Sequence, residues 1–407
     1  MRVPFFDLSL QYKQYGEEVE QAFLEILRTQ KFILGKYVNE LEEKLASLCG
    51  TRFAVAVSSG TDAILASLMA IGIKAGDEVI LPDFTFFATA GTVARLNAVP
   101  VFTDIDLKTF NISSEAVKAN ITSKTKAIIP VHLYGRCANM SELKKISEEY
   151  NIPLIEDACQ AIGSYTSDGY RAGSVGSLAC FSFYPTKNLG GAGDAGAITT
   201  DDKELYEKLK QMRNHGMEPR YYHSFIGGNF RMDELQAAFL LKKIPFLQNW
   251  NKARRATAEL YRDLFDSVGL FHKGAADLSD TVNIILPEAD FHKHIACSTN
   301  NNTNTTNNNK LNLNNYHTFH QYVIRCKKRD ELKTFLAEKQ IGTDIYYPVP
   351  LHKQKCFEYL NHDDAKLKNT NKICDEVLAL PIFPELKVEQ VKYVVQQISE
   401  FYKTQTD

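Results

Sequence analysis

Between residues 53 and 200 the chain alternates between short apolar runs and segments with helical spacing, which restricts the folds open to it. Strands that alternate with helices predict a largely parallel sheet covered by helices on both faces. Strand ends and helix starts then meet along one edge, where ligands usually bind. The expected strands are 53–57, 78–81, 99–103, 127–131, 153–156, 179–183 and 195–200, and the expected helices are 62–71, 86–96, 113–119 and 141–150.

The flanking segments predict more helices and a second, smaller domain. Helical spacing recurs at 17–27, 38–48 and 202–212. A further helical pattern over 233–244 is interrupted by Pro245, which lacks the N–H of a helix interior, so we place a domain boundary there. Beyond it we expect helices at 251–265, 329–338 and 388–402 and strands at 321–324 and 343–346. The prediction is therefore a large α/β domain over 1–244 and a small α+β domain over 245–407.

Lys187 and Asp157 suggest the chemistry. Lys187 follows an apolar run and precedes a glycine-rich stretch, and Asp157 ends an apolar strand thirty residues earlier. Pyridoxal phosphate needs a lysine amine for its aldehyde and a carboxylate that keeps its pyridine nitrogen protonated. A solvated surface lysine and a turn aspartate are the simpler alternatives. The pairing nevertheless indicates a cofactor site.

A phosphate site is expected at Ser59, Gly60 and Thr61, which precede the helix at 62–71. A helix start offers backbone N–H groups and hydroxyls, and glycine lets the backbone approach the anion closely. An ordinary N-cap is the simpler alternative and is compatible with phosphate binding. A Rossmann dinucleotide site is disfavoured, because no GxGxxG follows the first strand and the glycines at 190–193 come too late.

Six motifs, in order, resemble the DegT/DnrJ/EryC1/StrS family of pyridoxal-phosphate-dependent nucleotide-sugar aminotransferases. They lie at 58–63, 130–135, 156–158, 182–188, 228–232 and 347–352, and the resemblance extends from Pro4 to Pro384. It implies fold type I: a large domain with a mostly parallel central sheet and a smaller C-terminal α+β domain. It also implies a homodimer with shared active sites that aminates a keto nucleotide-sugar, with glutamate as the amino donor.

The resemblance assigns roles around the cofactor ring. Lys187 becomes the Schiff-base lysine and the general base that moves protons between substrate and cofactor, which requires a neutral amine. Asp157 becomes the partner of the pyridinium nitrogen. Gln160 is placed to contact the phenolic oxygen. Phe86 is placed to stack on the open face of the ring. One of the neighbouring phenylalanines could be meant instead, and core packing is the simpler alternative.

The resemblance also assigns contacts to the phosphate and the substrate. Ser182 supplies a phosphate-binding hydroxyl, and Asn229 reaches the phosphate from the second subunit. Tyr184 and His352 are the expected contacts to the sugar or its diphosphate. Arg231 is a further substrate candidate, with a structural ion pair as the equal alternative.

Two other functions were weighed on the same fold. A pyridoxamine-dependent sugar dehydratase of this family has histidine at the lysine position, so Lys187 argues against it. A catalytically silent regulator or sugar-binding module would be expected to lose Lys187, Asp157 or the Ser59-Gly60-Thr61 turn, and all are present. The nucleotide, the carbon that is aminated and the pathway are left open by the sequence.

Composition excludes several classes of partner. The formal net charge is −2, so neither a nucleic acid nor an acidic membrane surface is expected as a partner. The eight cysteines form no CxxC pair, which gives no sign of a metal site, and we interpret Cys159 as a small buried neighbour of the cofactor. No apolar signal region or run of about 20 apolar residues occurs, so a cytoplasmic enzyme is expected.

An insertion rich in Asn and Thr interrupts the small domain at 300–315, within about 298–316. Its composition cannot bury enough apolar surface to offset the entropy of ordering, so we predict a disordered surface loop. The family lacks this segment. An insertion without function is the simpler interpretation, and partner binding is the alternative.

Overall fold

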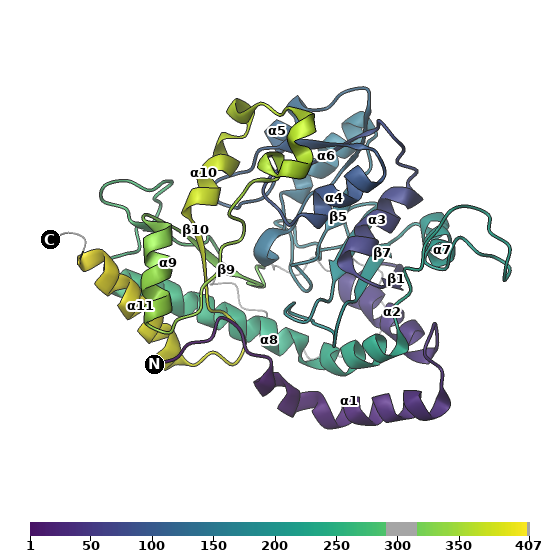
Figure 1. The fold of residues 1–407 in the computed structure, drawn as a ribbon, viewed down its shortest axis with the longest axis horizontal. Helices are drawn as coiled ribbons and strands as arrows, with labels where there is room; N and C mark the ends of the chain where they lie inside the picture. Colours follow the sequence, from purple (N-terminus) through teal and green to yellow (C-terminus); the bar gives the residue numbers. More distant parts are fainter. Residues whose placement is uncertain (290–315, 405–407) are drawn as a thin grey trace.

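The computed structural model describes residues 1–289 and 316–404 (Figure 1). The Asn-rich segment at 300–315 lies outside the described residues. The prediction of a disordered loop there is therefore not tested.

The central sheet consists of two parts, β3-β2-β4 and β5-β6-β7-β1, which isolated bridges join between β4 and β5. Its strand order is therefore β3-β2-β4-β5-β6-β7-β1. Pairing is parallel from β3 to β6, and only β7 runs antiparallel to both of its neighbours. The predicted, largely parallel sheet is thus confirmed, with β7 as the exception. The strands are β1 (Phe53–Val57), β2 (Glu78–Pro82), β3 (Val99–Thr103), β4 (Thr125–Ile128), β5 (Ile155–Asp157), β6 (Leu178–Ser182) and β7 (Gly196–Thr200).

Helices cover both faces of this sheet. Successive residues of a strand point to opposite faces, so alternate residues pack against different helices. Val55 and Val57 of β1 pack with α3, while Ala54 and Ala56 pack with α2 and α8. Both faces are therefore apolar and buried, as expected for a central parallel sheet. The covering helices before α8 are α1 (Ser9–Thr29), α2 (Lys36–Cys49), α3 (Gly60–Ala70), α4 (Ala88–Arg95), α5 (Ser114–Ala119), α6 (Met140–Tyr150) and α7 (Lys203–Met212).

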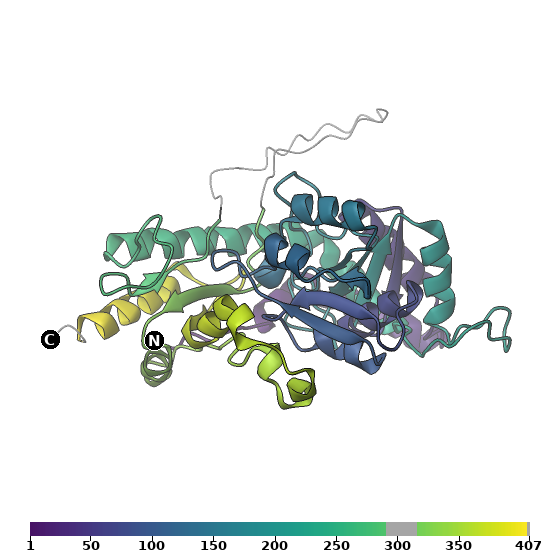
Figure 2. The same cartoon turned by 90° about the horizontal axis from the view of Figure 1, so that it is seen from above.

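The predicted interruption at Pro245 is wrong, because α8 runs unbroken from Glu234 to Ser267 with Pro245 inside it. A proline costs the helix one backbone hydrogen bond, but packing at both ends outweighs that loss. Leu240 belongs to the apolar cluster beneath the sheet, and Tyr261 and Phe265 belong to the C-terminal cluster. The chain therefore passes between its two cores inside a single helix, and Figure 2 shows this helix extending from the C-terminal elements to the central sheet. The division at residue 244 stays a prediction.

The C-terminal part contains an antiparallel sheet of order β10-β9-β8, with β8 (Ile284–Ile285), β9 (Tyr322–Cys326) and β10 (Val377–Leu380). Its helices are α9 (Arg329–Glu338), α10 (Lys368–Glu376) and α11 (Val388–Lys403). The strand predicted at 343–346 is wrong, because only Asp344 pairs, in a single bridge to Ala379. The strand that pairs fully with β9 is β10, which the sequence analysis missed.

Candidate active site

A cavity of about 540 Å³ opens where β5 and β6 end and α3 and α4 begin, at the predicted edge of the sheet. Segments far apart in the sequence meet there, including the C-terminal residues Tyr346 and Tyr347. Nine residues of the predicted site line the cavity: Ser59, Gly60, Thr61, Phe86, Asp157, Gln160, Ser182, Tyr184 and Lys187.

Lys187 lies on a tight turn that follows β6. Its backbone N–H donates to the carbonyl oxygen of Tyr184 at 2.8 Å. A Cβ at Gly190 would lie 2.2 Å from the carbonyl oxygen of Pro185, so the turn requires glycine there. Burial lowers the pKa of Lys187, while Cys159 and Asp157 oppose that shift. A lowered pKa raises the fraction of neutral amine, the form that a nucleophile or base needs.

Asp157 ends β5 and is only 5% exposed. Its Oδ2 accepts a hydrogen bond from Thr89 Oγ1 at 2.8 Å, and its Oδ1 accepts one from the backbone N–H of Cys159 at 3.2 Å. These two donors hold the carboxylate in one orientation beside the cavity. A fixed carboxylate is what a pyridinium nitrogen needs as its partner.

The phosphate cradle predicted at the start of α3 has the required space and donors. Ser59 caps the helix, because its Oγ accepts from the backbone N–H of Asp62 at 3.0 Å. A Cβ at Gly60 would lie 2.6 Å from Ser182 Cβ, so only glycine fits between the helix start and β6. The hydroxyls of Ser59, Thr61 and Ser182 thus line one end of the cavity. This end fits a phosphate group.

The opposite wall combines an amide with aromatic rings. Gln160 Oε1 accepts from the backbone N–H of Tyr134 at 2.7 Å, and its Nε2 donates to Tyr347 Oη at 3.2 Å. The ring of Phe86 is 56% exposed and lies 6.3 Å from the ring of Tyr347, centroid to centroid. A planar cofactor ring fits between such surfaces.

Four residues at or beside the cavity were not predicted from the sequence: Thr89, Tyr134, Tyr347 and His320, of which all but Thr89 line it. Tyr347 belongs to the motif at 347–352, which could have indicated it. His320 Nδ1 contacts Asn188 Oδ1 at 3.2 Å, next to Lys187, and burial lowers its pKa well below the usual value. His320 is therefore neutral near pH 7.

Three residues predicted for the site do not line this cavity: His352, Arg231 and Asn229. His352 is buried, and its two ring nitrogens contact Asp83 Oδ2 and Asp364 Oδ1, each at 2.6 Å. Arg231 donates to Asn214 Oδ1 at 2.7 Å. Asn229 is exposed on the segment after α7. Of these, His352 has both ring nitrogens occupied by protein, so the geometry does not favour the predicted substrate contact.

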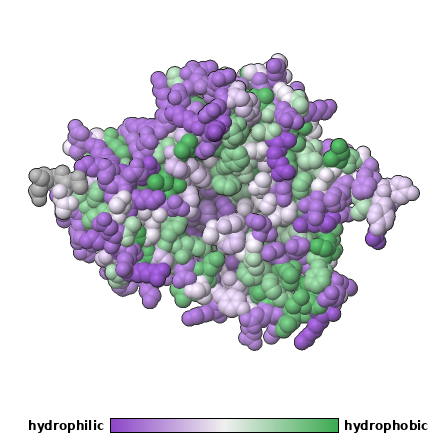
Figure 3. Space-filling model, viewed as in Figure 1, coloured by the Kyte–Doolittle hydropathy of each residue, from purple (hydrophilic) through white to green (hydrophobic). Residues whose placement is uncertain are grey.

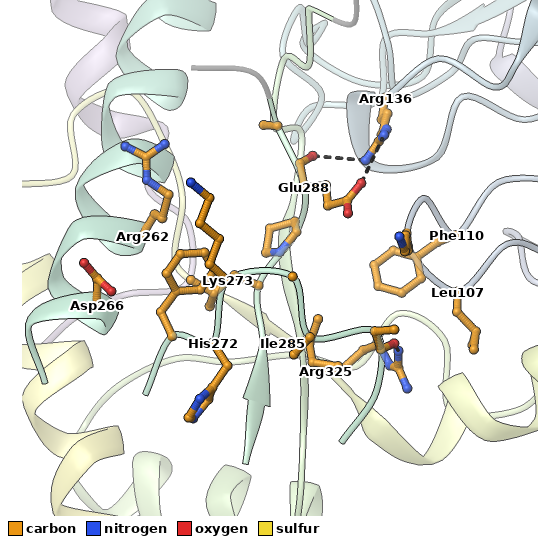
Figure 4. A pocket seen from close by; sticks show the side chains of 18 of the residues that line it. Leu107, Phe110, Arg136, Arg262, Asp266, His272, Lys273, Ile285, Glu288 and Arg325 are labelled. Atoms are coloured by element: carbon orange, nitrogen blue, oxygen red, sulfur yellow. Dashed lines mark hydrogen bonds and ion pairs between the residues drawn. The ribbon is translucent and has the colours of Figure 1, made fainter. Parts of the chain in front are cut away.

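A second cavity, of about 780 Å³, lies beside the C-terminal end of α8 (Figure 4). Two of its arginines have protein partners: Arg136 donates to the carbonyl oxygen of Glu288 at 3.1 Å, and Arg325 forms ion pairs with Asp277 and Glu376. None of the predicted site residues lines it. The smaller cavity is therefore the candidate active site.

Within 1–289 and 316–404 no group of three or more His, Cys, Asp or Glu side chains could hold a metal ion. In the same ranges, no helix has both the length and the apolar character needed to cross a bilayer.

Comparison with known proteins gives consistent matches over nearly the whole chain. The model of the DegT/DnrJ/EryC1/StrS aminotransferase family matches residues 13–300 and 289–399. A pleiotropic regulatory protein of Geobacillus stearothermophilus is 44% identical over 404 residues, with 99% of each chain covered. A UDP-N-acetyl-3-dehydro-alpha-D-glucosamine 3-aminotransferase of Acidithiobacillus ferrooxidans is 38% identical over 396 residues, with 97% of each covered.

Solved structures give the same result. DesV of S. venezuelae, in complex with a ketimine intermediate, superposes with a TM-score of 0.86 at 33% identity, with 98% of each chain covered. NtdA of Bacillus subtilis, with bound pyridoxamine phosphate, superposes with a TM-score of 0.81 at 31% identity, covering 98% of this chain and 85% of that one.

Proposed function

This chain belongs to the DegT/DnrJ/EryC1/StrS aminotransferase family, and from that premise we propose that it transfers an amino group from glutamate to the keto carbon of a nucleotide-linked sugar. It is a pyridoxal-phosphate-dependent aminotransferase with the fold of this family. One observation supports the proposal above others: the cavity that holds Lys187 on its glycine turn also holds the oriented carboxylate of Asp157.

The names of the relatives support the substrate class. The A. ferrooxidans relative acts on a UDP-linked 3-dehydro sugar. A transaminase of Aneurinibacillus thermoaerophilus, 36% identical over 399 residues, is named for a dTDP-linked 3-amino sugar. We infer that the keto group aminated by this chain is at C3. Both nucleotides occur among these relatives, so the assay below includes both.

Eight of the predicted residues that line the cavity would hold the cofactor. When bound, the cofactor would supply an aldehyde for the lysine amine and an electron sink for the reacting carbon. Lys187 would bind it covalently and later move a proton, for which its lowered pKa suits it. Asp157 would pair with the ring nitrogen, Gln160 would contact the phenolic oxygen and Phe86 would cover the ring. The phosphate would be held by Ser59, Gly60, Thr61 and Ser182.

We place the substrate beyond the cofactor, toward the exposed mouth of the cavity. Tyr184 lines this cavity and is 53% exposed, which suits a contact to the sugar. Arg231 stays a candidate for the diphosphate on the resemblance alone, since its guanidinium donates to Asn214 Oδ1 and does not line the cavity. His352 is retained only as a structural residue.

We further propose a homodimer in which each active site is formed by residues of both chains. The segment after α7 projects from the body of the molecule (Figure 1) and carries exposed side chains at Tyr221, Tyr222 and Ile226, which are 73%, 71% and 87% exposed. Figure 3 also shows apolar side chains gathered over the C-terminal half of α1, where Leu24 and Leu27 are about half exposed. Packing against a second copy would cover such surfaces. Asn229 is exposed next to this projecting segment, and in such a dimer it would face the partner's site.

The name of the G. stearothermophilus relative raises a regulatory alternative. A regulator without catalysis has no need of a lysine whose pKa is lowered by burial beside an oriented carboxylate. The two functions are separated by activity, since a regulator binds ligand without transferring an amino group.

The test is an amination assay with glutamate, pyridoxal phosphate and UDP- and dTDP-linked 3-keto and 4-keto sugars, read by mass spectrometry. We expect one aminated 3-keto product, and we expect Lys187→Ala to reduce its rate by at least about 1,000-fold. Loss of the cofactor's absorbance band on addition of glutamate, without any sugar product, would leave the donor half intact and refute only the proposed acceptors. A band that glutamate does not change, with no product, would refute the enzyme and favour the regulator.

A further inference from the structure

Lys243 of α8 is an almost fully buried lysine, with an exposure of 2%. Its Nζ donates to the carbonyl oxygen of Gly190 at 2.6 Å, on the turn that carries Lys187. Buried lysines are rare and are retained where their ammonium groups find partners. The partner here is the backbone of the proposed cofactor turn.

Three aromatic rings surround the same ammonium group. The Nζ of Lys243 lies 5.3 Å from the ring centroid of Tyr15, 5.1 Å from that of Phe239 and 5.6 Å from that of Trp250. Such contacts with ring faces stabilise a cation. Burial lowers the pKa of Lys243 to about 8, with Glu385 opposing the shift, which agrees with an enclosed and largely dry site. The side chain is therefore held firmly on the side of the turn away from solvent.

Two more polar side chains of α8 hold the same turn. Asn251 Oδ1 accepts from Asn188 Nδ2 at 2.8 Å. Gln236 Oε1 accepts from the backbone N–H of Ala192 at 2.9 Å. These three α8 residues are seven and eight positions apart, about two helical turns each, so they share one face of the helix.

We propose that this face of α8, formed by Gln236, Lys243 and Asn251, positions the turn from 187 to 192, with Lys243 as its central positioning residue. The turn needs such support because it belongs to no ladder, and the Gly190 carbonyl would otherwise lie buried without a partner. None of the three touches the reacting atoms. They act by fixing the position of the Lys187 amine. A misplacement of about 1 Å at a reacting group can lower the rate about 100-fold. The inference rests on the proposed role of Lys187.

The direct test is Lys243→Met, which keeps the length and apolar stem but removes the donor. We expect kcat to fall by about 10- to 100-fold while the KM for glutamate changes by less than about threefold, because placement is lost but substrate binding is not. We also expect the pH midpoint of the absorbance band of the lysine-bound cofactor to shift.

A second readout needs no cofactor. In the cofactor-free protein, hydrogen exchange of the amides of Gly191 and Ala192 should become faster in Lys243→Met, because these amides donate to Phe183 and Gln236 within the supported turn. If Lys243→Met does not fold, Gln236→Leu tests the same face at a half-buried position and should show a smaller change of the same kind.

Lys242→Met is the matched control. Lys242 is adjacent and partly exposed, and it lies 3.9 Å from Glu18 rather than near the turn. The Lys242→Met variant should leave kcat, the pH midpoint of the absorbance band and the amide hydrogen exchange of the turn unchanged. Wild-type values of all three in Lys243→Met would overturn the inference, and so would equal effects of the two lysine variants.

Lys187→Ala separates this inference from the proposed function. Loss of the lysine-bound absorbance band in Lys187→Ala, together with wild-type behaviour of Lys243→Met, would overturn only the positioning role. Retention of that band in Lys187→Ala would overturn the assignment of Lys187 itself and, with it, the inference built on it.

Discussion

At the scale of single residues, the orientation of Asp157 depends on a threonine that the sequence did not reveal. Thr89 is fully buried in α4, and its hydroxyl donates to Asp157 Oδ2 and lies 3.1 Å from the hydroxyl of Thr85. Asp157 was predictable because a carboxylate at a strand end has a chemical signature. Thr89 was not, because its role depends on how α4 packs against β5, which only the folded chain determines.

Thr89→Val keeps the shape of this side chain and removes its hydroxyl. A hydrogen bond to a charged group is worth about 1.5–3 kcal/mol, so we expect kcat to fall by about 10-fold or more as the carboxylate loses its orientation. Thr92→Val is the matched control, because Thr92 is one turn away, is equally buried and donates to the backbone carbonyl oxygens of Ala88 at 2.9 Å and Thr89 at 3.4 Å rather than to a carboxylate. Equal rates in the two variants would show that Asp157 does not need Thr89.

At the scale of elements, His352 attaches the segment that carries Tyr347 to the end of β2. Both ring nitrogens contact carboxylates, Asp83 on one side and Asp364 on the other, and Lys353 Nζ lies 3.4 Å from Asp364. Burial of the ring opposes protonation, but the two carboxylates outweigh it, so the pKa of His352 is raised above its usual value. The attachment is therefore strongest when the ring is charged.

A stability measurement against pH tests this attachment. Because the folded pKa of His352 lies above the unfolded value, its stabilisation is fully present below about pH 6.5 and is lost as the pH rises through the folded pKa. The free energy of unfolding from urea titrations should fall less over this range in His352→Asn than in the wild type. His223→Asn, at an exposed position, should keep the wild-type slope. Equal slopes in wild type and His352→Asn would contradict the assignment.

Most of the central elements could be predicted from the sequence because their signal is local. Periodicity located the seven strands of the sheet, since each needs an apolar run for two buried faces. The errors came where tertiary packing decides: the helix continues through Pro245 because Leu240 before it and Phe265 after it are anchored in different cores. Likewise, β10 is a strand because β9 offers a partner, and 343–346 is not, since it lacks one beyond Asp344.

At the scale of the whole molecule, one of the predicted phosphate contacts, Asn229, does not line the candidate site. The cavity provides hydroxyls and backbone for a phosphate from Ser59, Thr61 and Ser182, but the asparagine expected at the phosphate does not line it. Asn229 is instead exposed next to the projecting, partly apolar segment. A dimer in which this segment crosses to the partner would complete both sites together.

Subunit mixing decides whether Asn229 serves its own chain or the partner. Lys187→Ala and Asn229→Ala should each be nearly inactive as purified homodimers. In a mixed dimer, one site pairs an intact Lys187 with an intact Asn229 from the other chain, so random reassociation should restore about a quarter of the wild-type activity. If Asn229 acts within its own chain, neither site of the mixed dimer has both residues and no activity returns. The control is each variant alone, at the same concentration, carried through the same dissociation and reassociation without mixing.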